Sequence, residues 1–188
     1  TWRIGPSLVF QRLWEELEFP QVIQHLLAGR RFQFPVERAL FLTVLHRLFV
    51  SGSDRSCILV WRKRHDIPGI GSLGLHQMYR SMGWLGQHLP EGEQEGATPF
   101  APRCTKDWFE ESLFERRRDL FSKLDLVFFD TTSIYFEGAG GETIGKRGKS
   151  KDHRPDLKQM VVGLVIDGEG RPLCCELWPG NTTDVKSL

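Results

Sequence analysis

The sequence predicts an α+β protein in which a helical N-terminal domain is followed by a three-stranded antiparallel meander. Two patterns support this class. Apolar residues recur at helical spacing between residues 7 and 88. Three apolar runs then follow one another at residues 126–129, 160–166 and 172–178, and the turn Asp167-Gly168-Glu169-Gly170 separates the last two. The 188 residues are enough for one domain or two small ones.

The helical domain is predicted to span residues 1–89. Residues 7–17 are amphipathic, and the apolar side chains expected on their packed face are Leu8, Phe10, Leu13, Trp14 and Leu17. Pro20 and Pro35 can each open a further helix, because proline is favoured in the first helical turn. The helix after Pro35 runs over residues 36–50 and ends before Gly52.

Two more helices and a linker follow. Ser53 or Asp54 can cap the next helix, which leads into the basic cluster at residues 62–65. Residues 75–89 form another helix, whose inward-facing side chains are expected to be Met78, Tyr79, Met82 and Leu85. Residues 90–104 are rich in proline and glycine and predict a surface linker. A helix over residues 105–123 then precedes the strands in a second domain, residues 105–188.

Composition excludes some functional classes. The net charge of +1 comes from 25 basic and 24 acidic residues, so affinity for nucleic acid has to come from local clusters. No segment approaches the roughly 18 apolar residues of a membrane span, and no signal-peptide pattern is present. We therefore expect a cytoplasmic protein without a membrane partner. The cysteine and histidine spacings match no zinc motif, so neither a zinc site nor a disulfide framework is expected.

Asp130 is the first candidate for chemistry. It follows the apolar run at residues 126–129, and an ionised carboxylate in such a setting needs a hydrogen-bond partner, a cation or a metal ion. It could cap a turn at the strand end with Thr131 and Thr132, or it could bind a metal ion. It could also be the nucleophile of a phosphatase similar to haloacid dehalogenases, although those enzymes have a second acid where Thr132 stands here.

The other carboxylates near the strands have simpler interpretations. Asp167 and Glu169 are expected in a hairpin turn, where Asp and Gly recur for backbone reasons. Asp184 fits the first turn of a helix. Glu137 stays open, because it follows the first strand and could approach a metal ion bound by Asp130.

A basic stretch lies between the first and second strands. Its six cations are Lys146, Arg147, Lys149, Lys151, Arg154 and Lys158. They form either a solvated loop or a surface that attracts DNA phosphates to the face with Asp130. Residues 140–147 nearly match a phosphate-binding P-loop, but Arg147 stands where Ser or Thr would hold magnesium, so a glycine-rich loop is expected. The clusters at residues 62–65 and 116–118 are exposed helix faces or phosphate contacts.

Three segments resemble the DDE transposases of bacterial insertion sequences, most closely the insertion-sequence-four superfamily. They are residues 128–132 (Phe-Phe-Asp-Thr-Thr), 150–159 and 180–184 (Gly-Asn-Thr-Thr-Asp), in this order, and the resemblance covers about residues 35 to 188. It implies an incomplete ribonuclease-H-like domain with Asp130 on its first strand. Asp130 would be one of three ligands of the Mg²⁺ or Mn²⁺ ions that support strand cleavage.

The resemblance also implies partners and a context. The protein would cut DNA at the terminal inverted repeats of a mobile element and join them to target DNA, as a nucleoid-associated homodimer. Residues 1–89 would bind element ends or form dimer contacts. The family's second Asp and its Glu lie on later elements, and the chain stops at Leu188 as a helix begins, so we expect a fragment. The alternatives are a non-catalytic DNA-binding fragment and a decayed transposase remnant.

Overall fold

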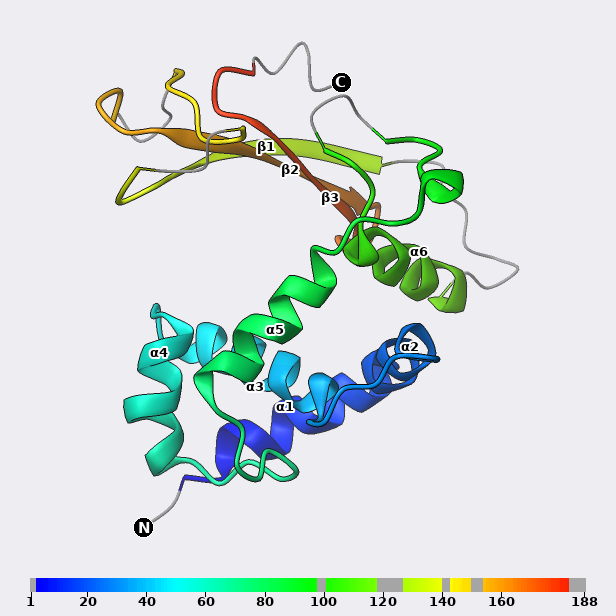
Figure 1. Cartoon of the computed structure of the whole chain (residues 1–188), viewed down its shortest axis with the longest axis vertical. Helices are drawn as coiled ribbons and strands as arrows, with labels where there is room; N and C mark the ends of the chain where they lie inside the picture. Colours follow the sequence, from blue (N-terminus) through cyan, green and yellow to red (C-terminus); the bar gives the residue numbers. More distant parts are fainter. Residues whose placement is uncertain (1–2, 98–100, 118–126, 140–142, 150–153, 183–188) are drawn as a thin grey trace. The chain divides into compact units, whose positions relative to one another are not determined.

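The computed structural model describes residues 3–97, 101–117, 127–139, 143–149 and 154–182 (Figure 1). It has α-helices and a three-stranded antiparallel sheet, which confirms the predicted α+β class. The chain divides into two compact units. The helical unit comprises Thr1–Gln87 and Cys104–Leu113, and the sheet unit comprises His88–Arg103 and Phe114–Leu188. Residues 105–113, which we had grouped with the strands, fall in the helical unit.

The helices lie close to the predicted ranges. Their bounds are α1 Gly5–Glu16, α2 Phe19–Leu26, α3 Val36–Phe49, α4 Asp54–Ser56, α5 Leu75–Leu85 and α6 Thr105–Arg117. A π-helical turn η1 (Cys57–Trp61) and a 3₁₀ turn η2 (Arg62–Arg64) continue α4, and a short 3₁₀ turn η3 (Glu91–Glu93) lies in the sheet unit. Residues 118–123, the end of the helix predicted over residues 105–123, lie outside the described residues. No helix in the described ranges is both long and apolar enough to cross a membrane.

Local chemistry explains where three helices begin. Pro20 stands in the first turn of α2, where its missing N–H costs nothing, and Pro35 directly precedes α3. Ser53 caps α4, because its hydroxyl accepts a hydrogen bond of 3.2 Å from the backbone N–H of Ser56. All three predictions are confirmed.

The core of the helical unit is built around α3. Phe41, Leu42 and Leu45 are fully buried there, and Trp14 of α1 and Met78 of α5 belong to the same cluster. The predicted inner faces of α1 and α5 were partly wrong. Four side chains that we expected to be packed are exposed, namely Leu8, Leu13, Leu17 and Tyr79, and Met82 is more than one-third exposed. On α1 the rings of Phe10 and Trp14 contact α3, so Leu8 and Leu13 point about 100° or more away from this stripe.

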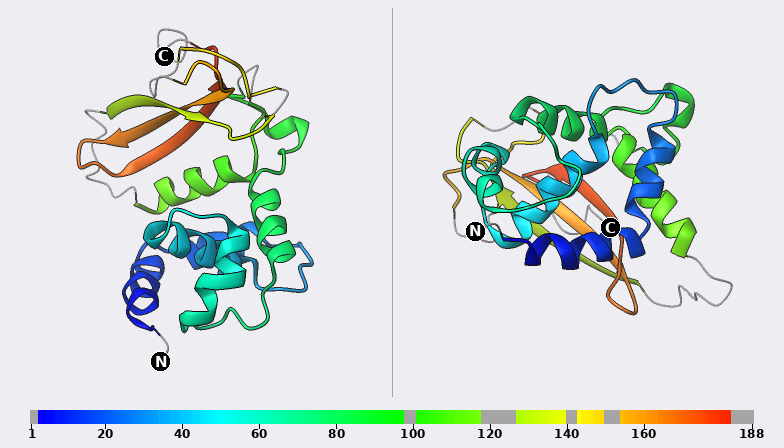
Figure 2. Two further views of the ribbon diagram at one scale, coloured as in Figure 1. Left: turned by 90° about the vertical axis from the view of Figure 1, so that its left-hand side faces the viewer. Right: turned by 90° about the horizontal axis from the view of Figure 1, so that it is seen from below.

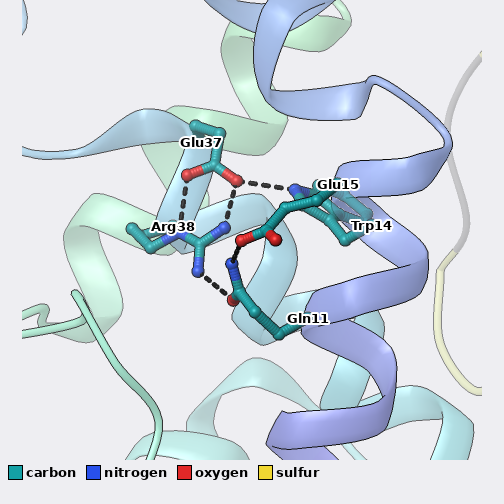
Figure 3. A network of polar contacts seen from close by, with 5 residues as sticks. All are labelled: Gln11, Trp14, Glu15, Glu37 and Arg38. Carbon is teal, nitrogen blue, oxygen red and sulfur yellow. Dashed lines mark hydrogen bonds and ion pairs between the residues drawn. The ribbon is translucent and has the colours of Figure 1, made fainter.

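A polar network fastens α1 to α3 at the edge of this core (Figure 3). The indole N–H of Trp14 donates to Glu37 at 2.6 Å, and the guanidinium of Arg38 donates both to Glu37 and to the side-chain oxygen of Gln11 at 2.5 Å. Gln11 in turn donates to Glu15. Arg38 also lies 4.7 Å from the ring centre of Phe41, so its charge is compensated by a carboxylate and an aromatic face.

The predicted linker forms a hydrogen-bonded loop within the sheet unit. The side-chain amide of Gln94 donates to the carbonyls of Leu89 and Arg103, and its oxygen accepts from the Arg103 N–H at 2.9 Å. The backbone N–H of Leu89 also donates to Arg103. One side chain therefore joins the two ends of the loop, of which residues 98–100 lie outside the described residues.

The sheet is the predicted meander, with strand order β1-β2-β3 and both pairs antiparallel. The strands are β1 Val127–Tyr135, β2 Gln159–Asp167 and β3 Pro172–Pro179, and they lie side by side in the left view of Figure 2. The turn after β2 is organised by Asp167, whose Oδ1 accepts from the N–H groups of Glu169 and Arg171, both at 2.9 Å. The predicted structural role of Asp167 is confirmed.

The two faces of the sheet differ in burial. Residues directly opposite in an antiparallel pair share a face, and successive residues alternate between faces. One face carries Phe129, Val161 and Trp178, and the rings of Phe129 and Trp178 meet edge to face. The other carries Phe128 and Leu164, which are 50% and 43% exposed. The apolar run at residues 126–129 favours a buried first strand, but on this second face the strand is exposed.

Candidate functional site

Asp130 lies in the middle of β1 on the exposed face of the sheet. It is paired with Leu164 of β2, and its side chain is exposed to solvent. Its Oδ1 accepts a 2.8 Å hydrogen bond from the backbone N–H of Thr131. The turn-cap interpretation is wrong, because pairing continues past Asp130 to Tyr135 opposite Gln159. Asp130 is thus a strand carboxylate among apolar neighbours rather than a strand-end cap.

Within the described residues no cation is paired with Asp130, and no group of three His, Cys, Asp or Glu side chains lies close enough together to hold a metal ion. A divalent ion such as Mg²⁺ takes about six oxygen ligands, of which Asp130 provides one or two. The described residues therefore do not fit a complete metal centre. Glu137 does not complete it, because it lies past the end of β1 at Tyr135 and belongs to no such group within the described residues.

The basic stretch is attached to the start of β2. Lys146 and Gln159 form an antiparallel bridge, in which each backbone N–H donates to the other's carbonyl, at 3.1 and 2.9 Å. The side chains of Lys146, Arg147 and Lys149 are exposed, and Lys158 is half-buried. Lys151 lies outside the described residues. The three exposed cations are therefore carried by a backbone that is fixed to the sheet.

Arg154 is paired with a neighbouring carboxylate. Its guanidinium donates to both carboxylate oxygens of Asp156, at 3.0 and 2.9 Å, and lies 5.7 Å from the ring centre of Tyr135. The hydrogen bonds from Arg154 lower the pKa of Asp156, and the charge of Arg147 lowers it further. A bidentate partner leaves Arg154 less able to bind a phosphate than the sequence suggested.

The P-loop alternative loses its structural basis. That motif requires a helix directly after the lysine, so that helical N–H groups can hold phosphate. Lys146 instead forms the bridge to Gln159, and residues 143–149 contain no helix. Residues 140–142 lie outside the described residues.

Asp130 and the basic stretch are farther apart than the sequence suggested. On β2, Leu164 is paired with Asp130 and Gln159 is paired with Lys146. Leu164 and Gln159 are five positions apart in the sequence. At about 3.3 Å per strand residue this is roughly 17 Å. The structure therefore gives a carboxylate on the sheet face and a basic segment at the end of the sheet, rather than one compact cluster.

The basic cluster at residues 62–65 is largely structural. The guanidinium of Arg62 donates to the carbonyls of Gly71 and Leu73, and so holds the loop before α5. His65 is buried and stacks on Trp61 with ring centres 3.9 Å apart. Only Lys63 and Arg64 of this cluster are exposed. In the cluster at residues 116–118, Arg118 lies outside the described residues.

Sequence reasoning missed Gln159, which is buried and bonds through its side-chain amide to Gly180 and Lys149. The available signal was a polar residue at the entrance of an apolar run, which we read only as part of the resembling segment. Comparisons with known protein families, with curated proteins and with solved structures found no match.

Proposed function

We propose that this chain is part of a DNA transposase of the DDE class, in which the sheet unit belongs to the catalytic domain. The observation that carries the proposal is the placement of two features on one meander. Asp130 is an exposed carboxylate on the first strand, and three exposed cations are fastened to the start of the second. The two features occur along the chain in the same order as the segments that resemble these transposases.

The basic segment, defined as residues 143–149, is proposed to contact the phosphate backbone of DNA. Exposed Lys and Arg side chains on a fixed backbone attract phosphates without reading bases. A separation of roughly 17 Å between this segment and Asp130 is smaller than the length of about 34 Å that one turn of duplex DNA covers. One bound duplex can therefore reach both features.

Asp130 is proposed to be one of the acidic groups that support strand cleavage. Its charge has no counter-ion in the described residues, and it stands beside apolar Leu164 and Phe128, where a carboxylate has no packing advantage. Mg²⁺ or Mn²⁺ would offset the negative charge that develops on the leaving oxygen. The described residues do not supply the remaining ligands.

The test is Asp130→Asn, which keeps the shape of the side chain and removes its charge. In the protein encoded by the complete reading frame, this change should abolish magnesium-supported strand cleavage and leave the melting temperature unchanged. Asp167→Asn is the matched control, because Asp167 organises a turn: it should lower the melting temperature and leave cleavage intact. Retained cleavage in Asp130→Asn would refute the catalytic role.

A non-catalytic DNA-binding function is the second candidate. It is favoured by one observation, namely that the described residues include no group of three potential metal ligands. DNA binding in a gel-shift assay, without magnesium-dependent nicking by either the chain or the complete reading frame, would support it over the enzyme.

A further inference from the structure

Gln159 joins three chain segments at the start of β2. Its side chain is only 1% exposed, and its amide nitrogen donates to the carbonyl of Gly180 at 2.9 Å and to that of Lys149 at 3.2 Å. Its backbone exchanges two hydrogen bonds with Lys146. The same residue therefore holds the basic segment at two points and attaches it to the end of β3. A buried amide is tolerated there because both of its N–H groups are bonded.

Two glycines allow this arrangement. A Cβ on Gly148 would lie 1.9 Å from the carbonyl oxygen of Gly180. A Cβ on Gly180 would lie 2.1 Å from the carbonyl oxygen of Gln159 and 2.4 Å from that of Lys146. These distances are far below van der Waals contact, so the three backbones meet only where side chains are missing. The Gly180 N–H also donates to Ile144 at 3.1 Å, which adds a further attachment of the basic segment.

We propose that Gln159 is a positioning residue for DNA binding, which holds Lys146, Arg147 and Lys149 in the arrangement that contacts phosphates. This inference rests on the proposed function, in which the basic segment binds DNA. A segment that is fixed before binding has less conformational freedom to lose when it contacts the duplex. Loss of the amide should therefore weaken DNA binding although no charge is removed.

The first test is Gln159→Met, which keeps the length of the side chain and removes both donors. We expect faster hydrogen exchange at the Lys146 and Gly180 amides, weaker binding to a random-sequence duplex, and a shallower plot of log affinity against log salt. The slope should fall by about 0.9 for each phosphate that the variant no longer neutralises. A purely structural role would lower the melting temperature and leave the salt slope of the folded protein unchanged.

The second test needs no change at Gln159. Gly148→Ala should disturb the attachment, because its methyl group meets the Gly180 carbonyl, and it should flatten the salt slope as Gln159→Met does. Gly138→Ala is the matched control, since no atom of the described residues lies within 4 Å of its added Cβ. It should leave both affinity and slope as in the unmodified protein. This glycine pair decides the question if Gln159→Met fails to fold.

Two failures can be told apart with a third variant, in which Lys146, Arg147 and Lys149 are replaced by Ala. If this triple variant weakens DNA binding while folded Gln159→Met and Gly148→Ala bind as the unmodified protein does, the positioning role is wrong and the proposed function stands. If the triple variant binds DNA with unchanged salt dependence, the proposed function of the basic segment fails, and the role of Gln159 fails with it.

Discussion

The helical unit and the sheet unit use their charged residues differently. In the helical unit Glu37 and Arg38 are mostly buried. They form hydrogen bonds with each other and with Trp14 and Gln11 (Figure 3). In the sheet unit Asp130 and Arg147 are exposed, and the structure gives them no packing role within the described residues. The chemistry of the first pair is explained by folding alone. Folding alone does not explain the charges of Asp130 and Arg147. A functional role is therefore sought in the sheet unit.

The largest expected effect tests whether α3 is the centre of the helical unit. Leu45 and Leu48 lie one turn apart on this helix, but Leu45 is 1% exposed and Leu48 is 57% exposed. Leu45→Ala should lower the free energy of unfolding by about 2 to 5 kcal/mol, because it leaves a cavity. Leu48→Ala should change it by no more than about 0.5 kcal/mol. Chemical denaturation followed by tryptophan fluorescence measures both, and similar losses would contradict the proposed centre of the core.

A smaller effect is expected at the buried face of the sheet. A Cβ on Gly163 would lie 2.4 Å from the ring of Trp178 and 2.8 Å from that of Phe129. Gly163→Ala should therefore destabilise the sheet unit by about 1 to 3 kcal/mol through overpacking. Hydrogen exchange at the backbone amides of β2 and β3 reports on the stability of this unit. An equal effect from Gly138→Ala, which has open space around it, would show that the loss does not come from the two rings.

Two buried polar residues, Gln159 and His46, differ in their hydrogen bonding. The amide nitrogen of Gln159 donates two hydrogen bonds, whereas His46 of α3 is 0% exposed and neither ring nitrogen has a hydrogen-bond partner within the described residues. Burial lowers the pKa of His46 below the ordinary value of 6.5, against the opposing charge of Asp54. The unfolded chain then binds a proton more readily than the folded one. Stability should therefore be complete above pH 6.5 and fall as the pH drops through 6.5 toward the lowered folded value.

The measurement for His46 is denaturant unfolding of the helical unit at several pH values on both sides of 6.5. His46→Leu removes the titrating group and keeps an apolar side chain in the core, so its stability should depend less on pH in this range. A variant with the same pH dependence as the unmodified protein would show that other groups are responsible.

The sequence was a good guide where local chemistry decides the structure. Pro20, Ser53 and the turn at Asp167 act on their own backbone or on residues within a few positions, so their roles could be read from composition and spacing. The exposure of Leu8 and Tyr79 could not be predicted, because it depends on which side of each helix meets its neighbour.

The candidate site shows the same limit. Asp130 could be identified as unusual from one apolar run, but its place in the middle of β1 depends on pairing with β2, about 30 residues later. Gln159 was missed because its partners, Lys149 and Gly180, are 10 residues before and 21 residues after it. Contacts at such distances are set by the tertiary fold, and no local pattern indicates them.

The most direct test compares three cations from each unit in one assay. Lys146, Arg147 and Lys149 of the sheet unit are replaced by Ala in one variant, and the exposed Arg30, Arg31 and Arg55 of the helical unit in the other. Both variants have three fewer positive charges, so a general effect of net charge is matched. Affinity for a random-sequence duplex is then measured over a series of salt concentrations. We predict that the slope of log affinity against log salt falls by about 0.9 for each phosphate no longer neutralised in the sheet-unit variant and stays unchanged in the helical-unit variant. An unchanged slope in the sheet-unit variant, or a decrease confined to the helical-unit variant, would contradict the claim that the sheet unit binds DNA.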